Sequence, residues 1–115
     1  MIGYVTLGTN DFPRAVAFYD ALFGSMGIDR YMEEENAFVA WAPAPDQPAV
    51  AVSVPFNKEP ATAGNGTMVA LFLDSPEKVD ALYNKALELG GTDEGQLGFR
   101  PTDATSGFYA GYFRD

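Results

Sequence analysis

The segment at residues 4–13 reads YVTLGTNDFP. Its first half alternates between apolar and polar side chains, a pattern typical of a half-buried strand. Asn10 or Asp11 can then cap a helix, and Pro13 occupies a first-turn position where its missing N–H costs nothing. Residues 4–13 therefore predict a strand that leads directly into a helix.

An apolar stripe follows, spaced at three and four residues as on one face of an amphipathic helix. Its members are Phe12, Ala15, Val16, Tyr19, Leu22, Phe23 and Met26. Gly27 can adopt the left-handed conformation that commonly ends a helix. Three strands are expected next, at residues 29–33, 37–42 and 49–54. The first half of the chain thus predicts a strand, a helix and three strands.

The same order of signals recurs at residues 68–76, which read MVALFLDSP. Leu7 and Leu71 lie 64 positions apart, and Pro13 and Pro76 lie 63 apart. A second apolar helical stripe follows and ends at two consecutive glycines. Self-similarity at a fixed period indicates a duplicated unit.

The repeat predicts two βαβββ modules within one domain that spans residues 1–115. The predicted segments are module one at about 1–54, a connector at 55–66 and module two at 67–115, with its later strands near 92–96 and at 108–113. Two modules of about 64 residues would need about 128 positions, so the second is about 13 residues short and lacks its last strand. We favour a truncated sequence over a module that leaves a sheet edge uncovered.

The composition excludes several kinds of site. The chain contains no cysteine and no histidine, which excludes disulfides, thiolate zinc sites and a Ser-His-Asp triad. A net charge of -9 disfavours nucleic acid as a partner and suits a cationic ligand. Neither a membrane-spanning apolar run nor a signal peptide is evident, so we expect a cytoplasmic protein without a membrane partner.

Four local sequences resemble the vicinal oxygen chelate superfamily of glyoxalase I, bleomycin-resistance proteins, fosfomycin-resistance enzymes and extradiol dioxygenases. They are residues 5–11 (VTLGTND), 15–22 (AVAFYDAL), 79–91 (VDALYNKALELGG) and 108–115 (FYAGYFRD). The resemblance implies an α+β fold in which the paired modules form a cupped mixed sheet with the helices on its outer face. Family members commonly assemble with their clefts at two-fold interfaces, so a homodimer is expected.

Metal-dependent members of this superfamily bind one divalent ion in the cup, with ligands from the first and last strands of each module. The resemblance places two of these positions at Tyr4 and Met68, a third in residues 49–54 and the fourth beyond Asp115. Phenol and thioether groups are poor ligands for such ions, and residues 49–54 hold only alanine, valine and serine. We therefore expect that the metal site is lost and that no cofactor is bound.

Strand alternation directs a set of side chains toward the cup. The candidate ligand-binding residues are Tyr4, Thr6, Trp41, Met68, Phe72, Arg100 and Tyr109. Tyr109 is preferred to Tyr112 because the two have opposite parity in one strand. Arg100 is expected near the mouth of the cup, after a turn at Gly98-Phe99. Together these residues predict an apolar, aromatic pocket with a few polar tips, as in many small-molecule sites.

Several of these candidates have a purely structural alternative. Met68 and Phe72 could fill the core of the cup. Trp41 could serve packing or an interface, where tryptophan is also enriched. Arg100 could instead form a surface ion pair with an acid of residues 93–103.

Three functions are compatible with these features. The first is a small-molecule binder that works without metal, like the bleomycin-resistance proteins. The second is a glyoxalase-, lyase- or isomerase-type enzyme that uses groups other than histidine, with Tyr4 or Tyr109 as the acid/base candidate. The third is an interaction module without a ligand. The lost metal positions favour the binder, and whether any catalysis occurs is left open.

Overall fold

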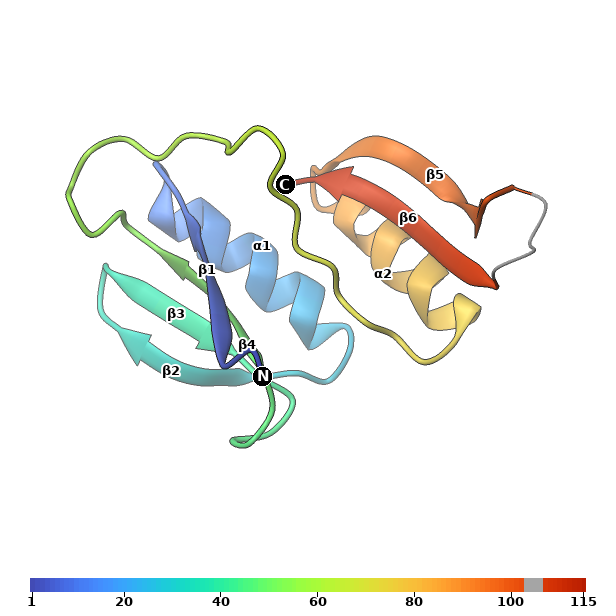
Figure 1. The fold of residues 1–115 in the computed structure, drawn as a ribbon. Helices are drawn as coiled ribbons and strands as arrows, with labels where there is room; N and C mark the ends of the chain where they lie inside the picture. Colours follow the sequence, from blue (N-terminus) through green and yellow to red (C-terminus); the bar gives the residue numbers. More distant parts are fainter. Residues whose placement is uncertain (103–106) are drawn as a thin grey trace. The chain divides into compact units, whose positions relative to one another are not determined.

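A computed structural model describes residues 1–102 and 107–115 and divides the chain into two compact units, Met1–Ala70 and Leu71–Asp115 (Figure 1). The first unit contains β1 (Tyr4–Gly8), α1 (Phe12–Gly24), β2 (Arg30–Glu34), β3 (Phe38–Trp41) and β4 (Ala49–Ser53). The second contains α2 (Pro76–Glu88), β5 (Thr92–Arg100) and β6 (Phe108–Arg114). The described residues therefore form a mixed α+β fold, as predicted.

The four strands of the first unit form one mixed sheet in the order β1-β4-β3-β2. β1 runs parallel to β4, whereas β3 is antiparallel to both of its neighbours. A parallel pair needs a long connection between its strands, and the helix with the two intervening strands supplies it. This arrangement confirms the predicted order of the first module, with strand ends that differ by about a residue.

α1 covers one face of this sheet because its sequence supplies both a cap and an apolar stripe. The Asp11 carboxylate accepts a hydrogen bond from the backbone N–H of Arg14 at 3.3 Å. The buried residues of the helix are Val16, Tyr19, Leu22 and Phe23. The rings of Tyr19 and Phe23 pack against Trp41 of β3, at centroid distances of 5.9 and 5.7 Å. Burial of these large rings makes this contact the centre of the first unit's core.

A hydrogen-bonded ion pair ties α1 to β2 and β3. Asp20 on α1 accepts from Trp41 Nε1 at 2.9 Å and from Arg30 Nε at 3.0 Å. Arg30 Nη2 donates to the second carboxylate oxygen at 2.5 Å. The hydrogen bonds from Arg30 are the largest cause of a lowered pKa at Asp20, and the bond from Trp41 lowers it further against the opposing effect of burial. One carboxylate therefore fixes the helix to two strands.

Asp20→Asn should lower the free energy of unfolding by about 1 kcal/mol near pH 7, because the pair is partly exposed and water weakens it. The folded-state pKa of Asp20 is lowered, so its ionised form stabilises the folded protein at pH values above the unfolded-state pKa of about 3.9. This stabilisation is lost as the pH falls through the lower folded-state pKa. Urea unfolding of both proteins from neutral to acidic pH measures the difference. The exposed Asp46→Asn is the control. An equal loss in the control, or a difference that persists in strong acid, would contradict this role.

In the second unit, α2 is joined to the antiparallel β5–β6 pair by reciprocal hydrogen bonds. Tyr83 on α2 donates to Asp93 on β5 at 2.7 Å, and Tyr109 on β6 donates to Asp80 on α2 at 2.6 Å. The Ser75 side chain caps the helix. The predicted second helix and its cap are therefore confirmed.

The start of the second module differs from the prediction. Within the described part of the chain, residues 68–73 pair with no other strand, so the strand predicted there is wrong. β5 is longer than the strand predicted near 92–96, and it continues through Gly98 and Phe99, where the sequence predicts a turn. The pairing shifts register on both sides of Gly95, so the chain bends by irregular pairing instead. The described second unit holds no counterpart of β4, the strand with which β1 pairs in the first unit.

Candidate functional site

The strand ladders determine which side chains share a face of the first unit's sheet. The ladders pair Thr6 of β1 with Ala51 of β4, and Ala51 with Ala40 of β3. Trp41, the residue after Ala40, contacts α1 and therefore points to the other face. The Thr6 row therefore lies on the face opposite α1, which we call the distal face. Its residues include Tyr4, Thr6, Met32, Phe38, Ala40, Ala49 and Ala51.

Small residues form the centre of the distal face, and larger polar groups lie at its β1 edge. The buried cluster consists of Ala40, Ala42, Ala49 and Ala51, and Phe38 packs against it. On β1 the Tyr4 side chain is 64% exposed, and Thr6 is also exposed. Val5 and Leu7, which alternate with them, are half-buried, as the alternation predicts. The β1 edge thus presents one aromatic ring and two hydroxyl groups.

Trp41 lies on the opposite side and belongs to the core. Its side chain is only 2% exposed, its rings contact Tyr19 and Phe23, and its Nε1 donates to Asp20. The structure therefore corrects the expected orientation of Trp41 toward the cup and agrees with the packing alternative.

Met68 and Phe72 lie in the irregular segment that precedes α2. Their side chains are 65% and 91% exposed, so neither fills a core. Leu71 and Leu73, on either side of Phe72, are half-buried. Met68 belongs to the first unit and Phe72 to the second. Both side chains are accessible to a ligand or a partner.

Tyr109 and Tyr112 lie on opposite faces of β6, but in the reverse of the expected arrangement. Tyr109 faces α2, where it donates to Asp80, and its ring meets Phe99 edge-on at 5.2 Å. Tyr112 lies under the guanidinium of Arg100, whose carbon is 5.6 Å from the ring centroid. The expected orientation of Tyr109 into the cup is therefore wrong, and Tyr112 occupies the face away from α2.

Tyr109 is also poorly suited to act as a base. Its hydrogen bond to Asp80 raises its pKa above the ordinary tyrosine value, and burial and the charges of Asp80 and Glu77 act in the same direction. The pKa of Tyr83 is raised in the same way by its hydrogen bond to Asp93. A phenol whose pKa is raised stays protonated at neutral pH and acts as a hydrogen-bond donor.

Asp80→Asn should lower the pH at which Tyr109 ionises, because a neutral amide does not repel the tyrosinate. In the wild-type protein the hydrogen bond from Tyr109 to Asp80 stabilises the folded state at pH values below the ordinary tyrosine pKa of about 10. This stabilisation is lost as the pH rises through the raised pKa of Tyr109 in the folded state. Ultraviolet absorbance during an alkaline titration measures the shift, and Tyr109→Phe identifies the signal. With Asp46→Asn as the control, a titration that Asp80→Asn leaves unchanged would argue against the assignment.

Arg100 ends β5 and is held by its own strand. Its Nη2 donates to the carbonyl oxygen of Gln96 and its Nη1 to that of Phe99, the latter at 3.4 Å. The guanidinium also makes a cation–π contact with Tyr112. The alternative ion pair with an acid of residues 93–103 includes Asp103, which lies outside the described residues.

At the three positions within the sequence where the resemblance places metal ligands, the residues do not fit a divalent ion. Tyr4 supplies a phenol, Met68 a thioether, and β4 only alanine, valine and serine side chains. Across residues 1–102 and 107–115, no three carboxylates come close enough together to hold a metal. In the same residues, neither helix has the length and hydrophobicity that a membrane span requires.

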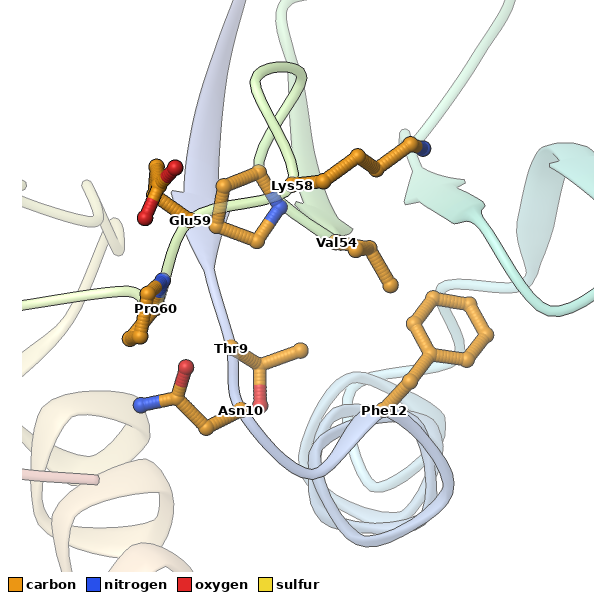
Figure 2. A pocket seen from close by; sticks show the side chains of 8 residues that line it. Thr9, Asn10, Phe12, Val54, Lys58, Glu59 and Pro60 are labelled. Atoms are coloured by element: carbon orange, nitrogen blue, oxygen red, sulfur yellow. The ribbon is translucent and has the colours of Figure 1, made fainter.

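The structure contains a pocket beyond the carboxyl ends of β1 and β4 (Figure 2), which the sequence does not predict. Its volume is about 320 Å³, and its lining residues are Thr9, Asn10, Phe12, Val54, Pro55, Lys58, Glu59 and Pro60. The Asn10 amide holds the connector in place, because its Nδ2 donates to the Ala61 carbonyl at 2.9 Å and its Oδ1 accepts from the Ala61 N–H at 2.7 Å. An asparagine before a helix is equally compatible with a cap, so the sequence carries only a weak signal for this clamp.

The comparisons with known proteins agree with this architecture. A family model for the Glyoxalase/Bleomycin resistance protein/Dioxygenase superfamily matches residues 1–115. The crystal structure of a glyoxalase/bleomycin resistance protein from Albidiferax ferrireducens T118 is similar to this chain, with 33% identity and a TM-score of 0.84. That match covers 100% of this chain and 89% of the other. The chain therefore belongs to the glyoxalase/bleomycin resistance protein/dioxygenase superfamily.

More distant structures share the fold alone. A hypothetical protein from S. aureus is 22% identical with a TM-score of 0.71, over 100% of this chain and 84% of that one. A glyoxalase/bleomycin resistance protein/dioxygenase family enzyme from Burkholderia phytofirmans PsJN is 20% identical with a TM-score of 0.56, over 83% and 77%. No curated protein shows a significant match to the chain.

Proposed function

We propose that this protein binds a small molecule on the distal face and does so without a metal ion. The observation that carries the proposal is the position of Tyr4 and Thr6, whose ring and hydroxyl groups are exposed on the face away from α1. An exposed aromatic ring beside two hydroxyl groups suits a ligand that both stacks and hydrogen-bonds. Met68 belongs to the proposed ligand-binding set because it is exposed and lies in the same unit as Tyr4 and Thr6.

Charge and donor chemistry support a particular class of ligand. A protein with a net charge of -9 attracts cations, so the proposed ligand is a cationic small molecule with an aromatic or apolar part. The side chains at the three metal positions within the sequence are poor ligands for divalent ions, which favours a metal-independent binder over a metal-dependent enzyme. We also propose that the protein forms homodimers, as members of its family commonly do.

A thermal-shift screen with divalent metals, aldehyde–thiol adducts and cationic antibiotics tests the ligand proposal. We expect a cationic small molecule to raise the Tm without added metal, because a ligand that binds only the folded state stabilises it. Tyr4→Ala and Thr6→Val should reduce that shift. Thr62→Val, which changes an exposed threonine of the connector, should leave it intact. Stabilisation by metal would favour the enzyme instead, and no stabilisation at all would contradict a small-molecule site.

A further inference from the structure

The connector contains an asparagine that is followed directly by a glycine, Asn65-Gly66. The backbone nitrogen after an asparagine can attack the side-chain amide carbon and close a succinimide ring. A Cβ on the following residue crowds that nitrogen, and glycine has none. The other asparagines of the chain all precede residues that carry a Cβ, namely Asp11, Ala37, Lys58 and Lys85.

The structure leaves this dipeptide exposed and lightly held. Asn65 and Gly66 are the central residues of a turn that the Thr67 N–H closes by donating to the Gly64 carbonyl at 3.0 Å. Both central residues are exposed, and Gly66 has a φ of +90° with open space where a Cβ would lie. Among the described residues, the Asn65 amide has no hydrogen-bond partner. An exposed turn held in this way opens at little cost in free energy.

The state of the attacking nitrogen separates Asn65 from the other asparagines. That nitrogen must lose its proton before it attacks, and a hydrogen bond to an acceptor holds the proton in place. Within the described chain, the Gly66 N–H has no acceptor. At three other sites the N–H is already bonded: Asp11 donates to Thr9 Oγ1 at 3.0 Å, Ala37 to the Glu34 carbonyl at 3.1 Å and Lys58 to the Pro55 carbonyl at 3.0 Å. Lys85 lies within α2, where N–H groups bond along the helix.

We propose that Asn65 is a site of spontaneous deamidation in the folded protein. The Gly66 nitrogen gives up its proton to solvent base and attacks Cγ of Asn65. The bond from Cγ to the side-chain nitrogen breaks, and that nitrogen leaves as ammonia. Water then opens the succinimide, giving aspartate if the bond to Cγ breaks and isoaspartate if the bond to the main-chain carbonyl breaks. One water is consumed and one ammonia released, and nothing is oxidised or reduced.

Either product changes the chemistry of the connector. Each adds one carboxylate to a chain whose net charge is already -9. Isoaspartate also inserts one carbon into the main chain, which alters the path of the segment that leads to Met68. The inference needs only the turn and its backbone hydrogen bonds, so it does not depend on the proposed ligand site.

Peptide mapping by mass spectrometry of the folded protein, incubated at neutral and at mildly alkaline pH, tests this site. We expect the peptide that contains Asn65 to gain the mass difference between an amide and a carboxyl group, faster at the higher pH. The other asparagines should stay intact over the same period.

Three variants assign the chemistry. Asn65→Gln should lose the modification, because its longer side chain closes a larger ring more slowly. Gly66→Ala should slow it at least about tenfold, which corresponds to about 1.4 kcal/mol of activation free energy. Asn57→Gln, in the same connector, is the matched control and should leave the rate at Asn65 unchanged. Far-ultraviolet circular dichroism verifies that each variant is folded.

A synthetic peptide of residues 62–68 separates the effect of the sequence from that of the structure. Asn65 in the folded protein should react within about tenfold of the rate in the peptide, because opening the turn costs little free energy. If Asn65 stayed intact in the folded protein while the peptide reacted, the turn would protect the amide and the proposal would be wrong. Modification of Asn36 or Asn57 as fast as that of Asn65 would contradict the role of the free Gly66 N–H.

Discussion

Replacing Trp41 with alanine should lower the free energy of unfolding by about 3–5 kcal/mol. The indole is buried against Tyr19 and Phe23, so the change leaves a cavity between α1 and the sheet. It also removes the N–H that binds Asp20. Since domains of this size are stable by only about 5–15 kcal/mol, the variant should unfold at a much lower urea concentration, as measured by far-ultraviolet circular dichroism.

Two further variants separate the causes of this loss. Trp41→Phe keeps an aromatic ring and removes the donor, so it should cost about 1 kcal/mol for the hydrogen bond plus a smaller packing loss. Phe72→Ser, at an exposed position, should change stability by no more than about 0.5 kcal/mol. If Trp41→Ala and the wild-type protein had the same urea midpoint of unfolding, the core would not lie where we place it.

Gly91→Ala should destabilise the second unit by about 1–3 kcal/mol. A Cβ at this position would lie 2.9 Å from the carbonyl oxygen of Ala86 and 3.2 Å from that of Arg114. Both neighbours are backbone atoms, so the contact can be relieved only if the end of α2 or of β6 moves.

Gly24→Ala is the matched control for this clash. A Cβ at Gly24, the last residue of α1, meets nothing within 4 Å. Because alanine favours a helix by up to about 1 kcal/mol over glycine, this variant should be as stable as the wild type or more stable. Thermal unfolding of both variants measures the two effects, and equal destabilisation by both would rule out a steric cause at Gly91.

The parts of the fold that could be predicted from sequence are those that depend on neighbouring residues. Each helix begins with a capping side chain, Asp11 or Ser75, followed by a proline and an apolar stripe, and all of these signals lie within a few turns of one another. Strands β3 and β4 were also predictable, because prolines and charged turns bound each apolar run.

Strand pairing was harder to predict because it depends on a partner elsewhere in the chain. Residues 68–73 alternate like β1, but a pattern does not supply the strand with which they would pair. β5 shows the same limit, since its bulged pairing with β6 carries it through Gly98, where the sequence alone favours a turn.

The candidate site was predictable only where one face of a strand is clearly polar. Tyr4 and Thr6 alternate with Val5 and Leu7, so the structure places them as expected on the side away from α1. Residues 37–42 are apolar on both faces, and alternation therefore does not reveal that Trp41 faces the helix. Likewise, which tyrosine of β6 faces α2 is decided by Asp80 on that helix and not by the sequence of the strand.

The proposed ligand site is the β1 edge of the distal face. The most direct test is to titrate the most stabilising compound from the screen into isotope-labelled protein and to follow the backbone amide resonances. We predict the largest changes at Tyr4 and Thr6 and at Ala51, the ladder partner of Thr6. Changes confined to α2, or to the loop from Val54 to Pro60, with β1 unaffected, would contradict this site.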